Sequence, residues 1–237
     1  MRGPTLGIAL AYAWVSFPFT LFALESNTND TLVACLMLAA LLAASYRSNL
    51  ATAGRGALAA LAGLTKFAPL AIAPVLATDA LRGLPVRRRP LAYAIFLLAF
   101  AGAGAIAFIP ALAHDSLHTI YERTLAYQGN RGSPFSVWGL WGLRGIEQGV
   151  EIAAVALALA VALVPRRLDM VGLAAACGAA ILGVQLGLEH WFYLYIPWFF
   201  PLVLLAMLGR FGEPLSQVPG VASGSARSSR PEAVLSS

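Results

Sequence analysis

The chain has 237 residues and a formal net charge of +5, with 59% hydrophobic and only 11% charged residues. Soluble domains carry about a quarter charged residues, so this composition excludes an ordinary soluble protein and indicates an integral membrane protein. The apolar stretches have the length of helices and lack the ten-residue alternation of a membrane barrel, so we predict an all-α, polytopic fold.

Two apolar stretches at the start of the chain are expected to cross the membrane in opposite directions. Leu6–Leu24 follows Arg2 and ends at the polar residues 25–30, and Leu32–Ala44 leads back to Arg47. Because basic residues concentrate at the cytoplasmic ends of membrane spans, we place Arg2 and Arg47 inside and residues 25–30 outside.

The third apolar run, Ala57–Ala77, has Lys66 at its centre and arginines on both sides, including Arg55. If both flanks are cytoplasmic, the run must enter the membrane and return. Each arm, 57–66 or 67–77, has about eleven residues, or roughly 16 Å of helix, which is about half of the hydrocarbon core. We therefore predict a re-entrant pair of half-helices with Lys66 at its tip, where a lysine is a functional-site candidate. The alternative is a lysine that snorkels to one interface from an ordinary span.

Four further spans are expected after this hairpin. The first contains Gly102 and Gly104, which would allow close helix packing, and a polar connection over residues 114–151 follows it on the outside. The four spans are Leu91–Leu112, Ile152–Val164, Met170–Leu188 and Trp191–Leu208.

The prediction is a transmembrane domain over residues 1–208, with about six membrane-crossing helices plus the re-entrant pair, and a disordered cytoplasmic tail over residues 209–237. On this topology the inner segments hold twelve arginines and four acids, whereas the outer segments hold three arginines and seven acids. The positive charge is therefore an orientation signal of a plasma-membrane protein. We expect membrane lipid around the chain and no nucleic-acid partner.

Polar residues from four separate segments are expected to meet at the outer face: residues 25–30, Lys66, residues 123–131 and Glu189-His190. Cations that offer charge-assisted hydrogen bonds near the outer leaflet suit a phosphate or pyrophosphate group. His190 either donates a proton or binds phosphate near neutral pH, or is a structural interfacial histidine. Asp30 is either the N-cap of the second helix or a general base.

The long outer connection contains the residue types of a sugar site. If residues 120–127 form a short helix, Arg123 and Tyr127 share one of its faces. The alternative is a solvated interfacial loop with snorkelling arginines. Asn, Gln, Arg and Trp side chains together suit a sugar site, since they offer hydrogen bonds to hydroxyl groups and an aromatic platform for the ring. The connection contains Gln128, Asn130, Arg131 and Trp138. No spacing of His, Cys or carboxylates indicates a metal site, so we expect no metal ion or other cofactor.

Several of these segments carry a family resemblance. Asn29-Asp30 and Gly63-Leu-Thr-Lys66-Phe-Ala-Pro69 resemble the central region of the GT-C membrane glycosyltransferases. Residues 128–136 and Glu189-His190-Trp-Phe-Tyr193 are similar to the DUF2029 (GT87) branch, which includes polyprenyl-phosphate-mannose-dependent mannosyltransferases. The resemblance spans Leu6 to about Leu208. It implies transfer of a sugar from a polyprenyl-phosphate donor lipid to a glycan or glycolipid acceptor on the extracytoplasmic face.

The resemblance also implies roles for individual residues. Lys66, Arg131 and His190 would bind the lipid phosphate, which must be stabilised as a leaving group. Members of this family carry their key acid in a first external loop, after a helix that does not precede Leu6 here. We therefore expect the C-terminal portion of a longer enzyme, inactive alone, with Asp30 and His190 as the candidate catalytic residues. The remaining substrate-binding candidates are Arg123, Tyr127, Gln128, Trp138 and Glu189.

Two alternative interpretations give the chain a function without catalysis. A multi-pass transporter with a half-helix hairpin rests on similar physics, and an accessory membrane subunit would need no chemistry at all. A transporter needs polar residues that are accessible from both faces of the membrane, whereas the candidates here gather on one face.

Overall fold

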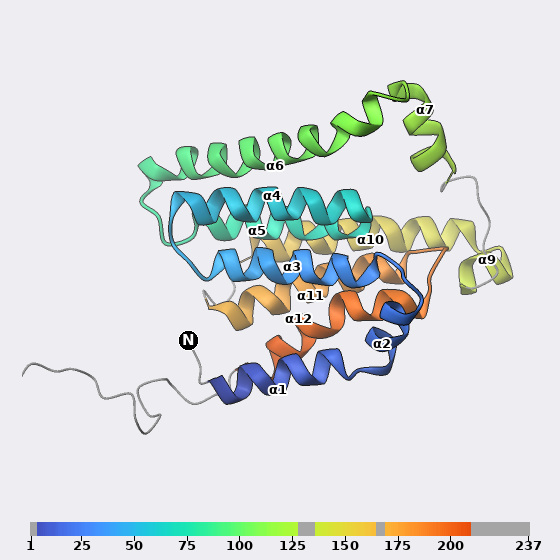
Figure 1. Ribbon diagram of the computed structural model, residues 1–237, viewed down its shortest axis with the longest axis horizontal. Helices are drawn as coiled ribbons and strands as arrows, with labels where there is room; N and C mark the ends of the chain where they lie inside the picture. The colour runs from blue at the N-terminus through green and yellow to red at the C-terminus, as the bar shows by residue number, and fades with distance from the viewer. Residues whose placement is uncertain (1–3, 128–135, 165–168, 210–237) are drawn as a thin grey trace, which may run out of the picture.

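The computed structural model describes residues 4–127, 136–164 and 169–209, and all regular structure in these ranges is helical. The long helices run roughly parallel or antiparallel to one another in one bundle, with α6 along one edge and α1 along the opposite edge (Figure 1). The predicted all-α fold is therefore confirmed for the described chain. The residues from 210 onward, which we expected to form the tail, lie outside the described ranges.

The elements follow one another in a simple order. The amino-terminal half contains α1 (Pro4–Val15), α2 (Pro18–Glu25), α3 (Asp30–Ala44), α4 (Asn49–Thr65), η1 (Ala68–Ile72) and α5 (Ala73–Leu81). The middle contains η2 (Val86–Arg88), α6 (Arg89–Leu112), α7 (Leu117–Tyr121) and the π-helical turn η3 (Glu122–Ala126). The last part contains α9 (Val137–Trp141), α10 (Arg144–Leu163), α11 (Met170–Leu186), η4 (Tyr193–Tyr195) and α12 (Ile196–Leu208).

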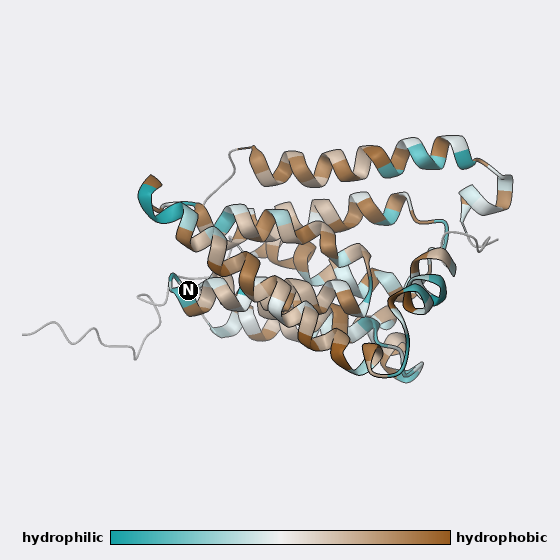
Figure 2. Cartoon of the chain, turned by 90° about the horizontal axis from the view of Figure 1, so that it is seen from above, coloured by the Kyte–Doolittle hydropathy of each residue, from teal (hydrophilic) through white to brown (hydrophobic). Residues whose placement is uncertain are grey.

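Within the described residues, two helical segments are long and apolar enough to cross a membrane, Val86–Leu112 and Arg144–Leu163, and the bent pair α1–α2 is a third if it counts as one span. Large apolar side chains such as Leu98 and Ile152 point outward and are exposed, as expected for a surface that faces lipid. Figure 2 shows hydrophobic residues along the helices and hydrophilic residues toward their ends. These apolar helices suggest that the chain associates with a membrane. Other apolar helices of the described chain have only 10–17 residues, so length alone supports two or three spans rather than six.

The first predicted span is not one straight helix. We expected Leu6–Leu24 to be continuous, but α1 ends at Val15 and α2 begins at Pro18, with a 57° bend between them. Proline lacks the N–H that would continue the hydrogen-bond ladder and is well suited to the first turn of a new helix. Phe17 at the bend stacks on Phe200 of α12, with ring centroids 3.9 Å apart, so the bend wraps the start of the chain around α12.

The hairpin with Lys66 at its turn is present, but its arms are longer than predicted. The first arm, α4, has 17 residues, or about 25 Å of helix, and begins at Asn49 because Ser48 caps it through a 3.1 Å bond from Ala51 N. The expected flank residue Arg55 lies inside this helix and its side chain is only 1% exposed. It fits there because Asp79 of α5 neutralises it at 3.2 Å. The first arm is therefore a single helix, longer than the predicted eleven residues, and the second consists of the five-residue turn η1 followed by the nine-residue helix α5.

Close packing in the bundle depends on glycines other than those predicted. A Cβ on Gly102 or Gly104 would meet nothing within 4 Å, so our expectation that they bring helices together was wrong. Instead a Cβ on Gly56 of α4 would strike the backbone of Phe96 in α6. The buried core draws most of its residues from α3, α5, α11 and α12, with Met37, Leu76 and Trp198 among its larger members, and α4, α6 and α10 add a few more.

The polar connection is shorter than predicted. Helix α10 begins at Arg144 rather than near Ile152, so the end of the predicted outer loop is helical. The last predicted span, Trp191–Leu208, also begins later than expected. Residues 191–195 form a loop and the short turn η4, and α12 begins at Ile196. The start of α10 and the end of the 191–195 loop both contribute to the same cavity as Lys66.

Candidate functional site

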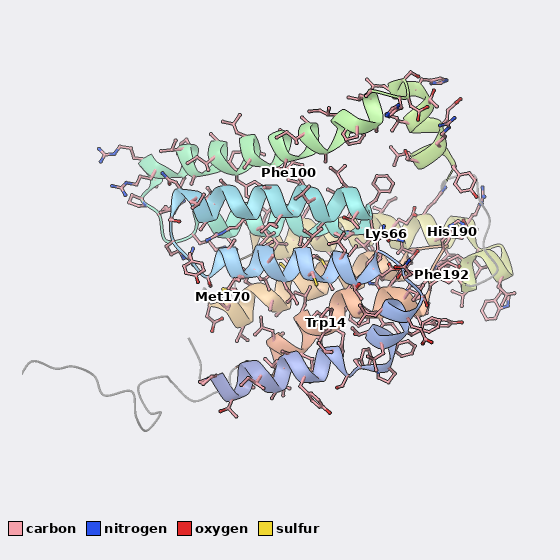
Figure 3. The ribbon with its side chains drawn as sticks, viewed as in Figure 1. Trp14, Lys66, Phe100, Met170, His190 and Phe192 are labelled. Atoms are coloured by element: carbon pink, nitrogen blue, oxygen red, sulfur yellow. The ribbon has the colours of Figure 1, made fainter. Side chains whose placement is uncertain are left out.

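A cavity of about 710 Å³ lies at this end of the bundle. The tip of the α4–η1 hairpin, η3, the start of α10 and the loop after α11 all contribute to its wall. Figure 3 shows Lys66 and His190 at this end, with Met170 at the opposite one. Among the residues that the structure describes, the cavity is lined by three cations, Lys66, Arg123 and Arg144, and by three carboxylates, Glu147, Glu151 and Glu189.

Lys66 reaches the cavity because the hairpin turns at this residue. Its backbone is extended, and its N–H still donates to the carbonyl of Ala62 at 3.1 Å, which closes the last turn of α4. Pro69 then opens η1, and a Cβ on Gly63 would meet the Leu70 side chain, so glycine lets the two arms approach directly beside the turn. The Lys66 side chain is 32% exposed. Its ammonium is therefore partly available to a ligand.

Asp30 is the counter-ion of Lys66 rather than a helix cap. Asn29 occupies the N-cap position and makes no side-chain capping bond, whereas Asp30 is the first residue of α3. Its Oδ1 accepts a 3.1 Å hydrogen bond from the Trp198 indole and lies 3.7 Å from Lys66 Nζ. The side chain is 2% exposed, and Asp30 is not among the described residues that line the cavity. The predicted N-cap was therefore wrong, and the carboxylate acts from beneath the cavity surface.

Two stacked aromatic rings complete the setting of Lys66. The Tyr195 and Trp198 rings stack with centroids 4.4 Å apart, and Lys66 Nζ lies 5.5 Å from the centroid of the Tyr195 ring, within the range of a cation–π contact. Gln185 positions this loop, since its Nε2 donates to Tyr195 O at 3.0 Å and its Oε1 accepts from the Trp191 indole at 3.3 Å.

Both residues of the Glu189-His190 pair line the cavity, as predicted. The Nε2 atom of His190 is buried and has no hydrogen-bond partner within the described residues. Gly187, just before this pair, lies close to α10, since a Cβ on it would lie 3.1 Å from Cγ and 3.3 Å from Cα of Glu151. The absence of a side chain thus lets α10 approach the loop that carries Glu189 and His190.

Arg123 reaches the cavity from a helix that differs from the predicted one. The helix begins at Leu117 rather than near residue 120, and it widens into the π-helical turn η3, where Arg123 lies. Arg123 Nη1 donates to both carboxylate oxygens of Asp115 at 3.1 Å, a pair that is largely exposed. The predicted short helix is therefore confirmed, although its bounds differ. Asp115, to which we assigned no role, binds Arg123 and fixes its position.

The remaining predicted site residues are not brought to the cavity by the described chain. Trp138 donates its indole N–H to the carbonyl of Leu186 at 3.0 Å and so fastens α9 to the end of α11. Tyr127 is exposed, and neither residue is among the described lining. Gln128 and Arg131 lie outside the described residues.

Sequence reasoning missed one face of α10. Arg144, Glu147, Gln148 and Glu151 all line the cavity, and their spacing of three, four and seven residues places them on one side of a helix. This polar stripe at the start of an otherwise apolar helix was the available signal, but the prediction treated the segment as loop. Trp198 was missed as well, because its role depends on a partner, Asp30, that is distant in sequence.

Chemically, the cavity offers cations to an anionic ligand and carboxylates to hydroxyl groups or protons. Within the residues that the structure describes, no group of three or more His, Cys, Asp or Glu side chains is arranged to hold a metal ion. Comparisons of the chain with family models, with curated proteins and with solved structures find no match.

Proposed function

We propose that this chain is a membrane glycosyltransferase, or a portion of one, that takes a sugar from a polyprenyl-phosphate lipid. The observation that supports this proposal most directly is the composition of the cavity. At one end of an apolar helical bundle it combines Lys66, Arg123 and Arg144 with three carboxylates. A lipid phosphate needs cations close to a lipid-facing surface, and a sugar needs hydrogen-bond acceptors for its hydroxyl groups.

In this proposal Lys66 is the principal phosphate ligand. Its pairing with Asp30 is imperfect at 3.7 Å, and a partly exposed ammonium can bind a phosphate oxygen while it keeps this counter-ion. As the bond between sugar and phosphate breaks, negative charge grows on the phosphate, and a fixed cation stabilises that charge most in the transition state. Arg123 and Arg144 would add charge from the far sides of the cavity.

In the proposed topology the chain lies in the plasma membrane and crosses it about six times. The α4–α5 hairpin enters the membrane from the cytoplasmic side and returns to it. Supporting it, the end of α3, the end of α5 and the start of α6 lie at the end of the bundle opposite the cavity (Figure 1). Arg47, Arg82 and Arg89 belong to these ends, and the positive-inside rule places such residues in the cytoplasm. The cavity then opens on the extracytoplasmic side, where a glycan or glycolipid acceptor would arrive. Mannose is the proposed sugar, from the resemblance of the sequence to the mannosyltransferases.

Lys66→Ala tests the proposal. Membranes that contain the chain are incubated with tritiated polyprenyl-phosphate mannose, and two quantities are measured: crosslinking of a photoreactive version of this donor, and label in products separated from it. We expect Lys66→Ala to lose donor crosslinking. We also expect its rate of sugar transfer to fall at least about a hundredfold, which is the effect of removing one oxyanion ligand. Arg88→Ala removes the same charge at the opposite end and should change neither quantity.

Three results would count against the proposal. Equal crosslinking by the wild type and Lys66→Ala would remove Lys66 from the phosphate site. Movement of intact donor across sealed membranes without label transfer would favour a transporter. Wild-type membranes with no more crosslinking or transfer than membranes that lack the chain would overturn the proposed function.

A further inference from the structure

Glu147 is a buried carboxylate in the wall of the cavity. The residue is only 6% exposed, yet it belongs to the cavity wall, so the cavity is its route to solvent. Within the described residues its carboxylate makes no hydrogen bond or ion pair. Burying an unpaired carboxylate destabilises the fold, and a destabilising residue of this kind in a cavity wall is typical of a functional site.

The other carboxylates near the cavity are less suited to proton transfer. Asp30 is already engaged by the Trp198 indole and by Lys66 and does not belong to the described lining. Glu151 is exposed, one helical turn further along α10. Glu189 also lines the cavity, but it is only half-buried and already takes part in another interaction. Glu147 therefore differs from Asp30 in reaching the cavity and from Glu151 and Glu189 in being buried.

We propose that Glu147 is the general base of the transfer reaction, an inference that rests on the proposed function. The acceptor hydroxyl oxygen forms a bond to the anomeric carbon while the bond from that carbon to the phosphate oxygen breaks. The electron pair of the broken bond stays on the phosphate, which leaves as a polyprenyl monophosphate beside Lys66. The hydroxyl proton passes to the Glu147 carboxylate and is later released to water, so charge and atoms balance.

This assignment replaces Asp30 as the candidate base. It also replaces the expectation that the chain is inactive alone, because the proposed base lies within the chain. We predicted a general base from the first external loop or from Asp30, whereas Glu147 comes from the first turn of α10. Its backbone is held there by the Glu147 N–H bond to Leu143 O at 3.0 Å. Arg144, on the same face and also in the cavity wall, provides a positive charge toward which the acceptor oxygen can be oriented.

The test separates this inference from the proposed function by measuring donor binding and transfer side by side. Glu147→Gln keeps the size of the side chain and removes its ability to accept a proton. We expect donor crosslinking within about twofold of the wild type and a loss of transfer of about a hundredfold to ten-thousandfold, the usual contribution of a general base. Glu122→Gln, on the exposed turn η3 and outside the described cavity wall, should leave both unchanged.

Two further measurements distinguish a catalytic from a structural role. The thermal unfolding midpoint of Glu147→Gln should equal or exceed that of the wild type, because the variant no longer buries an unpaired charge. Transfer by Glu147→Ala should recover in part with added formate, which can occupy the vacated space as a base. Retained transfer by Glu147→Gln, or a lowered midpoint with no rescue by formate, would overturn the inference. Wild-type membranes without any transfer would instead overturn the proposed function.

Discussion

The buried ion pair at the base of the α4–α5 hairpin should be a major source of its stability, and Asp79→Ala tests this. Arg55 Nη1 lies 3.2 Å from Asp79 Oδ2, and Arg55 Nη2 donates to the carbonyls of Ala44 and Tyr46 at 3.1 and 2.9 Å. Arg47 approaches the same Asp79 oxygen at 3.9 Å. Removing the carboxylate would leave a 1%-exposed guanidinium with carbonyl partners only, beside a second arginine.

Breaking a buried pair by removal of one partner costs about 3–5 kcal/mol, and we expect Asp79→Ala to lower the free energy of unfolding by that amount. The assay is unfolding by SDS titration in mild detergent micelles. Asp115→Ala is the matched control, because it breaks the largely exposed pair with Arg123, and such pairs contribute about 0–1 kcal/mol. Replacing both partners, as Arg55→Met with Asp79→Leu, should recover most of the loss. A loss below about 1 kcal/mol for Asp79→Ala would refute the reasoning.

Two further substitutions test the packing and the pairing around the hairpin by the same unfolding assay. Gly56→Ala should cost about 1–3 kcal/mol, because its Cβ would meet the Phe96 backbone, with the Phe96 carbonyl carbon at 3.1 Å. Gly54→Ala should be neutral or stabilising by up to about 1 kcal/mol, because its nearest neighbour, Ala43 Cβ, lies at an ordinary 3.5 Å, and equal effects would contradict the packing argument. Asp30→Asn, which can keep the Trp198 bond, should cost about 1–2 kcal/mol less than Asp30→Ala, and no difference would mean that this bond contributes little.

The helical class and the turn at Lys66 were predictable because they follow from local chemistry. A long apolar chain must satisfy its backbone polar groups within helices. The position of the turn followed from Lys66 at the centre of its apolar run, with arginines on both sides and prolines after it. Because successive helices alternate in direction, we predicted that Lys66 and Glu189-His190 would lie at the same end of the bundle. The structure brings these residues to one cavity.

The errors concern features that depend on partners distant in sequence. Arg55 resembles a helix flank until Asp79 is known to lie beside it. Asp30 resembles a helix cap, a common role for aspartate at this position, until Trp198 and Lys66 are seen to bind it. Periodicity could have identified the polar face of α10, but spacing alone does not reveal that Glu147 is desolvated.

The two ion pairs of the hairpin together explain how a cation comes to lie at the cavity. At the base of the hairpin Arg55 and Asp79 join α4 to α5, so the two arms are held to each other. At the turn Lys66 is held to Asp30 of α3, so the tip is fixed to the rest of the bundle. The base pair is buried, and Arg55 also donates to two backbone carbonyls, whereas the tip pair is longer and its lysine is partly exposed. This asymmetry leaves the base structural and makes the tip the end at which an anionic ligand can compete for the cation.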